Sequence, residues 1–216
     1  MNKLVLYFVV SGIILLANTC QGQTAIKLNL GIKSSSASTY INQEITNLII
    51  SHYQKEYKEG VMSKKVNDSV IEVSFHHKPE KDNPEKYWMI TMYIPRLKSN
   101  YISGPLYTSA NNIVCSVNTE GGGGGGNVWW NDVFVFQSNV NSFKLISCTN
   151  SPSICGCKEG NFYPSGIEFG QIAGNSRCWG ENDPHCCPSL YYKTIVKLDK
   201  DKLVFVSKTK LPALKK

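Results

Sequence analysis

The stretch VIEVSFHH at residues 70–77 decides the fold class, because apolar Ile71, Val73 and Phe75 alternate with polar residues. An alternation with a period of two residues is typical of a strand with one buried and one solvated face. Comparable runs follow along the chain, at residues 87–94, 113–117, 128–137, 143–148, 167–173, 176–179, 190–198 and 203–207. The first of these is apolar on both faces, which predicts a place near the middle of a sheet.

Turn residues separate several of these runs and predict hairpins between neighbouring strands. The turns are expected at residues 138–141, at Gly174-Asn175 and at residues 199–202. Strands joined by short turns are antiparallel. We therefore expect a mainly antiparallel β-sheet.

One segment instead has the spacing of an amphipathic helix. Its apolar and aromatic residues are Ile41, Ile45, Leu48, Ile49, Tyr53 and Tyr57. A serine or threonine can cap its start and Gly60 ends it, which predicts a helix over residues 39–59, with the tyrosines interpreted as core residues. One helix followed by antiparallel strands predicts a single α+β domain over residues 39–209, with the helix packed on one face of the sheet.

The N-terminus has the pattern of an export signal. A lysine at position 3 precedes an apolar run over residues 4–17, which is shorter than the roughly 20 residues of a membrane span. We expect residues 1–22 to be a signal peptide. Cleavage before Gln23 would release a soluble protein, whereas a lipoprotein signal would leave Cys20 lipidated and hold the protein on a membrane. Residues 23–38 are expected to form an extended lead-in.

The formal net charge of the 216-residue chain is +7, and most of the positive charge comes from scattered lysines. Nucleic-acid surfaces usually gather Arg and Lys with interleaved aromatic residues, so we expect no nucleic-acid partner. Residues 210–216 are expected to form a solvated basic tail.

Seven cysteines follow the predicted signal peptide: Cys115, Cys148, Cys155, Cys157, Cys178, Cys186 and Cys187. In an oxidising compartment most of them should form disulfides, with one left over because seven is odd. Adjacent cysteines fit disulfide geometry poorly as a pair. We therefore predict that the last two each join a different upstream cysteine, Cys178 or one of the pair at 155 and 157. A metal or redox site built on these cysteines is the alternative.

A run of glycines from Gly121 to Gly126 precedes Trp129 and Trp130. The run lacks the lysine and the following helix of a phosphate-binding loop, so we interpret it as a loop between strands. Successive strand residues face opposite ways, which predicts one tryptophan in the core and one near the surface. With Asp183 and His185, these residues make up the expected binding surface.

No pattern in the sequence indicates a catalytic site. Gly-x-Ser-x-Gly is absent, and no histidine pairs recognisably with a nucleophile. Glu168 and Glu181 with Asp183 are interpreted as solvated carboxylates and not as a glycosidase pair. We expect a protein that is not an enzyme, with no cofactor and no metal.

The segment Asp183-Pro184-His185-Cys186-Cys187-Pro188-Ser189, the strand at residues 131–136 and the glycine-rich loop before it resemble small bacterial exported proteins, including the LppP/LprE-like lipoproteins. The resemblance covers residues 90–207 and implies a place in the cell envelope. We expect a periplasmic or secreted, disulfide-braced protein that presents loops to a protein or small ligand. The alternatives are a periplasmic inhibitor or immunity-type protein, and a cysteine-based metal or redox protein.

Overall fold

The computed structural model describes residues 34–58, 60–76, 89–96, 100–106, 111–121, 129–140, 142–184 and 187–212. The chain divides into two units, Met1–Ser34 and Ser35–Lys216, and the description below concerns the second. The predictions made for the signal peptide, Cys20, Gly126, His185 and Cys186 lie outside the described residues.

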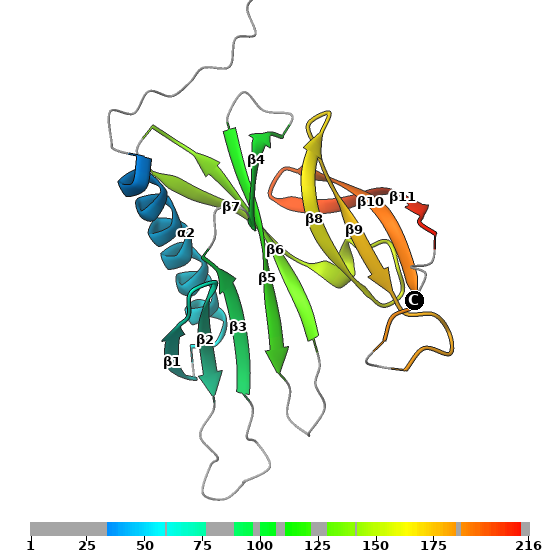
Figure 1. Ribbon diagram of the computed structural model, residues 1–216, viewed down its shortest axis with the longest axis horizontal. Helices are drawn as coiled ribbons and strands as arrows, with labels where there is room; N and C mark the ends of the chain where they lie inside the picture. Colours follow the sequence, from blue (N-terminus) through cyan, green and yellow to red (C-terminus); the bar gives the residue numbers. More distant parts are fainter. Residues whose placement is uncertain are drawn as a thin grey trace, which may run out of the picture. The chain divides into compact units, whose positions relative to one another are not determined.

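One α-helix, α2, runs over Ser34–Glu56 (Figure 1). Both of its ends lie nearer the N-terminus than predicted, and residues 34–38, expected to be extended, are helical. Neither Gly nor Pro occurs among those five residues, so nothing in the sequence stops the helix there. A last helical hydrogen bond joins the Tyr57 N–H to the Tyr53 carbonyl at 2.7 Å, and Gly60 follows.

Seven antiparallel strands form the larger sheet, in the order β1-β2-β3-β5-β6-β7, with β4 paired to β5. Their bounds are β1 Val61–Val66, β2 Val70–His76, β3 Met89–Pro95, β4 Tyr101–Pro105, β5 Asn111–Gly121, β6 Trp129–Ser138 and β7 Phe143–Asn150. The apolar strand β3 lies inside the sheet as predicted, between β2 and β5. The antiparallel arrangement is confirmed.

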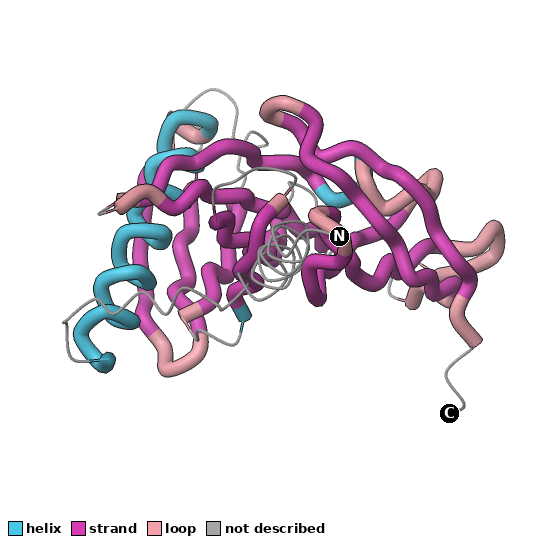
Figure 2. The backbone as a smooth tube through the Cα atoms, turned by 90° about the horizontal axis from the view of Figure 1, so that it is seen from above, coloured by secondary structure: helices cyan, strands magenta, loops and turns pink. Residues whose placement is uncertain are grey.

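A second sheet of four strands has the order β11-β10-β9-β8, and Figure 2 shows it as a separate group of strands. Its strands are β8 Gly160–Glu168, β9 Gln171–Cys178, β10 Leu190–Asp199 and β11 Lys202–Lys210. A short 3-10 helix, η3 Ser151–Ser153, follows β7. The prediction of one sheet is therefore corrected to two. Lys210, assigned to the tail, ends β11 opposite Tyr192.

The hairpin predicted at Gly174-Asn175 is wrong, because the turn lies at Phe169-Gly170. Both residues of that turn have positive φ, 49° and 74°, as short hairpin turns require. Gly174 lies inside β9, where an added Cβ would come within 2.6 Å of the Phe162 ring. This glycine therefore permits close packing and does not mark a turn.

Strands β1 and β4 and most of β8 were missed, and β5 and β11 were predicted too short. Strand β1 is exposed along its whole length, and β4 has five residues that include Gly and Pro, so neither shows a buried alternation. Strand β5 continues past the predicted end at 117 to Gly121, because it pairs with β6 as far as Glu120↔Trp129.

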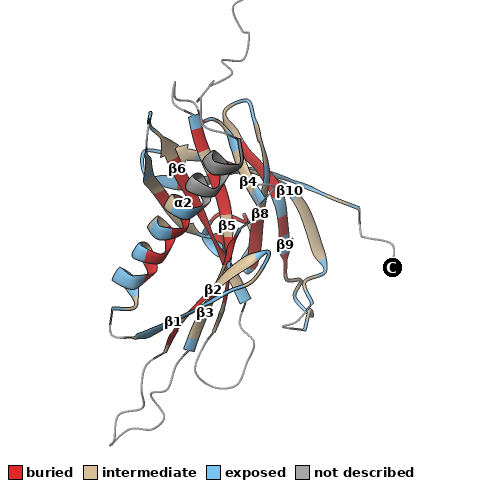
Figure 3. Cartoon of the chain, turned by 60° about the vertical axis from the view of Figure 1, so that its left-hand side comes forward, coloured by how far each residue is buried: buried red, intermediate tan, exposed pale blue. Residues whose placement is uncertain are grey.

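Two buried clusters lie on opposite faces of β6, and Figure 3 shows buried residues along the central strands β5 and β6. The first cluster consists of Ile45, Ile49, Ile50, Tyr53, Val73, Phe75, Met92, Ile94, Cys115, Val117, Phe134 and Phe136. The second consists of Leu106, Val114, Val133, Val135, Ile154, Cys155, Phe162, Ile172, Val196 and Leu203. Phe134 and Phe136 alternate with Val133 and Val135, so successive side chains of β6 enter different clusters.

Candidate functional site

A pocket of about 240 Å³ lies where the last turns of α2 meet strands β6 and β7. Its lining residues are His52, Glu56, Tyr57, Trp130, Asp132, Cys148 and Asn150. We call this the α2–β6 pocket. Three aromatic rings and two carboxyl groups among seven lining residues make its wall both apolar and polar.

The regular geometry of the helix and strands brings these side chains together. His52 and Glu56 are one helical turn apart, so they share a face of α2. Trp130 and Asp132 are two residues apart on β6 and point to the same side of the sheet. Asn150 is the cross-strand partner of Asp132. The pocket therefore combines residues almost a hundred positions apart in the sequence.

Asp132 lies at the inner end of a hydrogen-bond network that joins α2 to the sheet. The Tyr53 hydroxyl donates to its Oδ2 at 2.8 Å, and the Asn150 amide donates to its Oδ1 at 2.9 Å. Asp132 is only 7% exposed, and burial raises its pKa above the ordinary value in spite of these donors. An ionised Asp132 is therefore costly at this buried position.

Glu56 stands at the outer side of the pocket between two aromatic side chains. Its Oε2 lies 3.9 Å from His52 Nε2, and its carboxylate hydrogen bonds to the Tyr57 phenol. The His52 ring packs edge-on against Phe134, with centroids 5.5 Å apart. Glu56 thus carries an accessible negative charge beside two rings that are held in place.

Cys148 is a free thiol on the wall of the pocket. Burial raises its pKa, and the nearby carboxyl groups of Asp132 and Glu56 raise it further. A thiol attacks as the thiolate, so this environment opposes nucleophilic chemistry by Cys148. The arrangement can hold a ligand, but it does not activate a nucleophile.

The two tryptophans do face opposite ways, although neither is fully buried. Trp130 lines the α2–β6 pocket, whereas Trp129 is 48% exposed on the other face. There it stacks on Tyr93, with centroids 5.9 Å apart and planes 19° apart. The Tyr93 hydroxyl donates to Glu120 at 2.8 Å.

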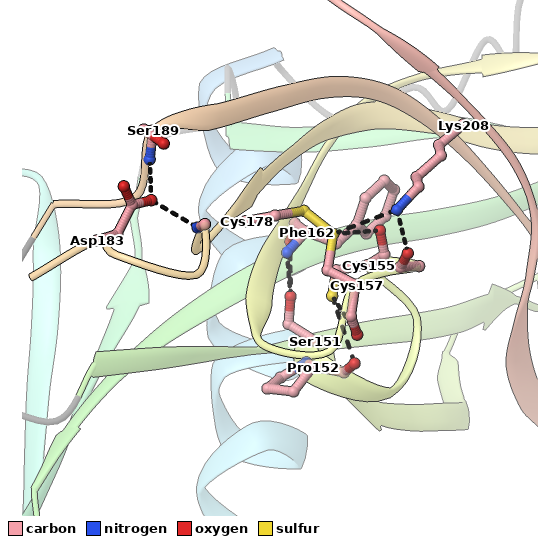
Figure 4. Close-up of a disulfide and its surroundings, with 11 residues drawn as sticks. Ser151, Pro152, Cys155, Cys157, Phe162, Cys178, Asp183, Ser189 and Lys208 are labelled. Carbon is pink, nitrogen blue, oxygen red and sulfur yellow. Dashed lines mark hydrogen bonds between the residues drawn. A yellow bond between two sulfur atoms is a disulfide. The ribbon is translucent and has the colours of Figure 1, made fainter. Parts of the chain in front are cut away.

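The presence of a disulfide is confirmed, but the predicted pairs are wrong. Most cysteines were expected to be paired, whereas Cys115, Cys148 and Cys155 are free. Cys157, in the loop before β8, is bonded to Cys178 at the end of β9, with Cα atoms 6.0 Å apart (Figure 4). Cys155 is a buried free thiol, and Cys157 and Cys178 bond to each other, so the predicted bond from Cys187 to one of these three cysteines does not form. Cys187 is disulfide-bonded, to none of the other described cysteines. The cause lies in the hairpin, because β8 and β9 pair at Gly160↔Cys178 and bring the loop before β8 to the end of β9.

A backbone feature next to this disulfide explains why Gly156 separates two cysteines. Gly156 has φ of 70°, and an added Cβ would overlap the ring of Phe205. The Lys208 ammonium donates to the Gly156 carbonyl and lies 3.9 Å from Cys157 Sγ (Figure 4). The loop is thus held from the β11 side as well as by the disulfide.

Asp183 has a role within its own loop. Its Oδ2 accepts hydrogen bonds from the Gly180 N–H at 2.6 Å and the Ser189 N–H at 2.7 Å (Figure 4). These backbone donors lower the pKa of Asp183. The first residue of the double-cysteine motif therefore closes the loop between β9 and β10 on itself.

The residues of the expected binding surface lie in separate places. Gly121 is a strand residue, and an added Cβ would come within 2.6 Å of the Met89 carbonyl. Trp129 and Asp183 also lie away from the lining of the α2–β6 pocket, and only Trp130 belongs to it. The sequence predicts no binding role for the other lining residues. It predicts Tyr57 as a core residue of the helix and Cys148 as a disulfide cysteine. Asp132, a carboxylate inside an apolar strand, was the signal that could have been used.

Comparisons with known proteins add no constraint. No family model matches the sequence, and neither a curated protein nor a solved structure matches it. The resemblance to LppP/LprE-like lipoproteins stays a prediction. Within the described ranges, no His, Cys, Asp and Glu side chains gather in a group of three or more that could hold a metal ion. No helix in the part of the chain that the structure describes is long and apolar enough to cross a membrane.

Proposed function

We propose that this protein is an exported binding protein without enzymatic activity, which takes a small ligand into the α2–β6 pocket. The observation that carries the proposal is the buried carboxyl group of Asp132 beside Trp130, at a concave site with several aromatic rings. Aromatic side chains with convergent polar groups are typical of small-molecule sites, and polar groups make up most of this wall.

Two features of the chain support export. The N-terminal residues have the charge and length pattern of a signal peptide. The Cys157–Cys178 disulfide suits an oxidising compartment. The envelope location, periplasmic or secreted, is part of the proposal, with membrane attachment only if Cys20 is lipidated.

Binding is favoured over catalysis by the state of the polar groups in the pocket. Cys148 has a raised pKa, which keeps the thiol protonated near neutral pH. Asp132 already accepts hydrogen bonds from Tyr53 and Asn150, so it is held rigidly and has little freedom to exchange a proton with a substrate. Fixed polar groups of this kind orient a ligand.

One observation favours the inhibitor or immunity-type alternative. Phe169, at the tip of the β8–β9 hairpin, is 93% exposed. An aromatic side chain presented on a hairpin tip is a suitable anchor for a protein partner. In this second candidate function the partner binds at Phe169, which does not line the α2–β6 pocket. Substitutions at Phe169 and in the pocket can therefore test the two functions separately.

Saturation-transfer NMR on the purified exported protein tests the first proposal. The protein is screened against mixtures of small polar cations, neutral polyols and anions. We expect bound molecules whose signals disappear in Trp130→Ala and persist in Trp129→Ala, which makes the same change on the opposite face of β6. Binding of no molecule from any class, or equal loss in both variants, would overturn the proposal.

A further inference from the structure

The α2–β6 pocket has an unbalanced charge. Glu56 and Asp132 bring two carboxyl groups to its wall, and no Lys or Arg is among its described lining residues. The whole chain has a formal net charge of +7, so the acidic lining of the pocket is opposite in sign to the net charge of the protein. A ligand that balances the charge of these two carboxyl groups must carry a positive charge.

We propose that the ligand is a small organic cation with an ammonium group; this inference rests on the proposed function and names its ligand class. The rings of His52, Tyr57 and Trp130 line the same pocket as the carboxyl groups. Aromatic rings attract cations through their negative faces, and quaternary ammonium ligands are recognised in this way. Carboxylates and rings together favour an alkylated ammonium over a metal ion.

Asp132 distinguishes a cation from a neutral sugar. Tyr53 and Asn150 donate to its two oxygens. Few lone-pair directions are left for the hydroxyl groups of a sugar. Neither donor carries a positive charge, so these hydrogen bonds do not neutralise the carboxylate. A nearby cation balances it without needing a free lone pair.

The pocket volume limits the ligand to a small molecule. A volume of about 240 Å³ suits a molecule with few non-hydrogen atoms. Choline is such a molecule and serves as the probe. In 3,3-dimethylbutan-1-ol a carbon atom replaces the charged nitrogen, which gives a neutral molecule of the same shape.

Titration calorimetry of the purified exported protein compares the two probes. The experiment is run at about pH 8, above the ordinary pKa range of carboxyl groups. We expect choline to bind at least about tenfold more tightly than the neutral alcohol, as desolvated cation–π and charge contacts imply.

Three variants identify the groups that bind the cation. Asp132→Asn should weaken choline binding about tenfold and leave binding of the neutral alcohol within about twofold. The charge is removed at constant size, and the Tyr53 hydroxyl, which donates to Oδ2, can turn to accept from the new amide. Glu56→Gln should have a smaller effect of about two- to threefold, because that carboxylate is exposed to solvent. Asp201→Asn, in the exposed turn before β11, should change neither affinity.

The outcomes separate the ligand class from the proposed function. Equal affinity for choline and the neutral alcohol would overturn the proposal of a cationic ligand, and so would an equal loss of affinity for both in Asp132→Asn. Either result would indicate a pocket that recognises the shape of its ligand. A neutral or anionic molecule that binds in the NMR screen while choline does not would also overturn it. If no molecule of any class binds the pocket, the proposed function fails with it.

Discussion

Two aspartates of this protein have pKa values displaced in opposite directions. Burial raises the pKa of Asp132 above its ordinary value of 3.8. Backbone hydrogen bonds from Gly180 and Ser189 lower that of Asp183 from the same value. The ionised form of the carboxyl group is thus destabilised at Asp132, where it is buried. It is stabilised at Asp183, where backbone N–H groups donate to it.

This contrast predicts opposite pH profiles of stability. The contribution of Asp132 is present in full below pH 3.8 and is lost as the pH rises through its raised pKa. The difference in melting temperature between Asp132→Asn and the wild type should therefore shift in favour of the variant as the pH increases from 3.8. Thermal melts between about pH 3 and pH 8 measure the difference. Parallel curves would show that Asp132 keeps an ordinary pKa.

Asp183→Asn should behave in the reverse way. Its stabilisation is present above pH 3.8 and is lost as the pH falls through the lowered pKa. The variant should melt below the wild type at neutral pH, and the two curves should converge in acid. A deficit that stays constant in acid would mean that the charge of Asp183 contributes nothing.

At the scale of elements, the β8–β9 hairpin shows where sequence reasoning succeeds and fails. The alternation at residues 70–77 and the turn at residues 199–202 gave β2 and the β10–β11 hairpin correctly, because burial pattern and turn chemistry agree there. Phe169 is not a turn residue by type, whereas Gly174-Asn175 is. The glycine has a packing role that depends on Phe162, across the hairpin.

The unfavourable turn residue gives a stability prediction. Phe169 has φ of 49° and is 93% exposed, so the left-handed conformation costs free energy that no packing offsets. Phe169→Asn should stabilise the protein by about 1 kcal/mol and raise its melting temperature by about 2–4 °C. Phe169→Ala is the control, since it removes the ring and keeps the strain. Equal melting temperatures for the two variants would contradict the prediction.

At the scale of the whole molecule, the α2–β6 pocket could not be predicted from the sequence. Tyr53 and Asp132 are joined by a hydrogen bond across 79 positions, and no local pattern reports such a contact. The division into two sheets was hidden for a similar reason. Val133 and Phe134 are both buried, and an apolar strand does not reveal that its two faces pack against different layers.

The disulfide pattern is also a property of the whole molecule. Peptide mapping without reduction should recover Cys157 bonded to Cys178, and Cys115, Cys148 and Cys155 should be labelled as thiols only after unfolding or slowly before it. Removing the bond with Cys157→Ala and Cys178→Ala should lower the free energy of unfolding by about 3 kcal/mol. Cys155→Ala, which breaks no bond, is the matched control. A peptide joining Cys155 to Cys178 would contradict this connectivity.

Strand β6 sends Phe134 and Phe136 into one buried cluster and Val133 and Val135 into the other. One strand therefore forms part of the boundary of both hydrophobic cores, with one core packed on each of its faces. If the residues packed on one face of β6 separate from it, the strand that supports the other core loses its cover on that face. Two cores that share a wall are expected to melt as one cooperative unit, so damage to the four-stranded sheet should also weaken the pocket on the far side of β6.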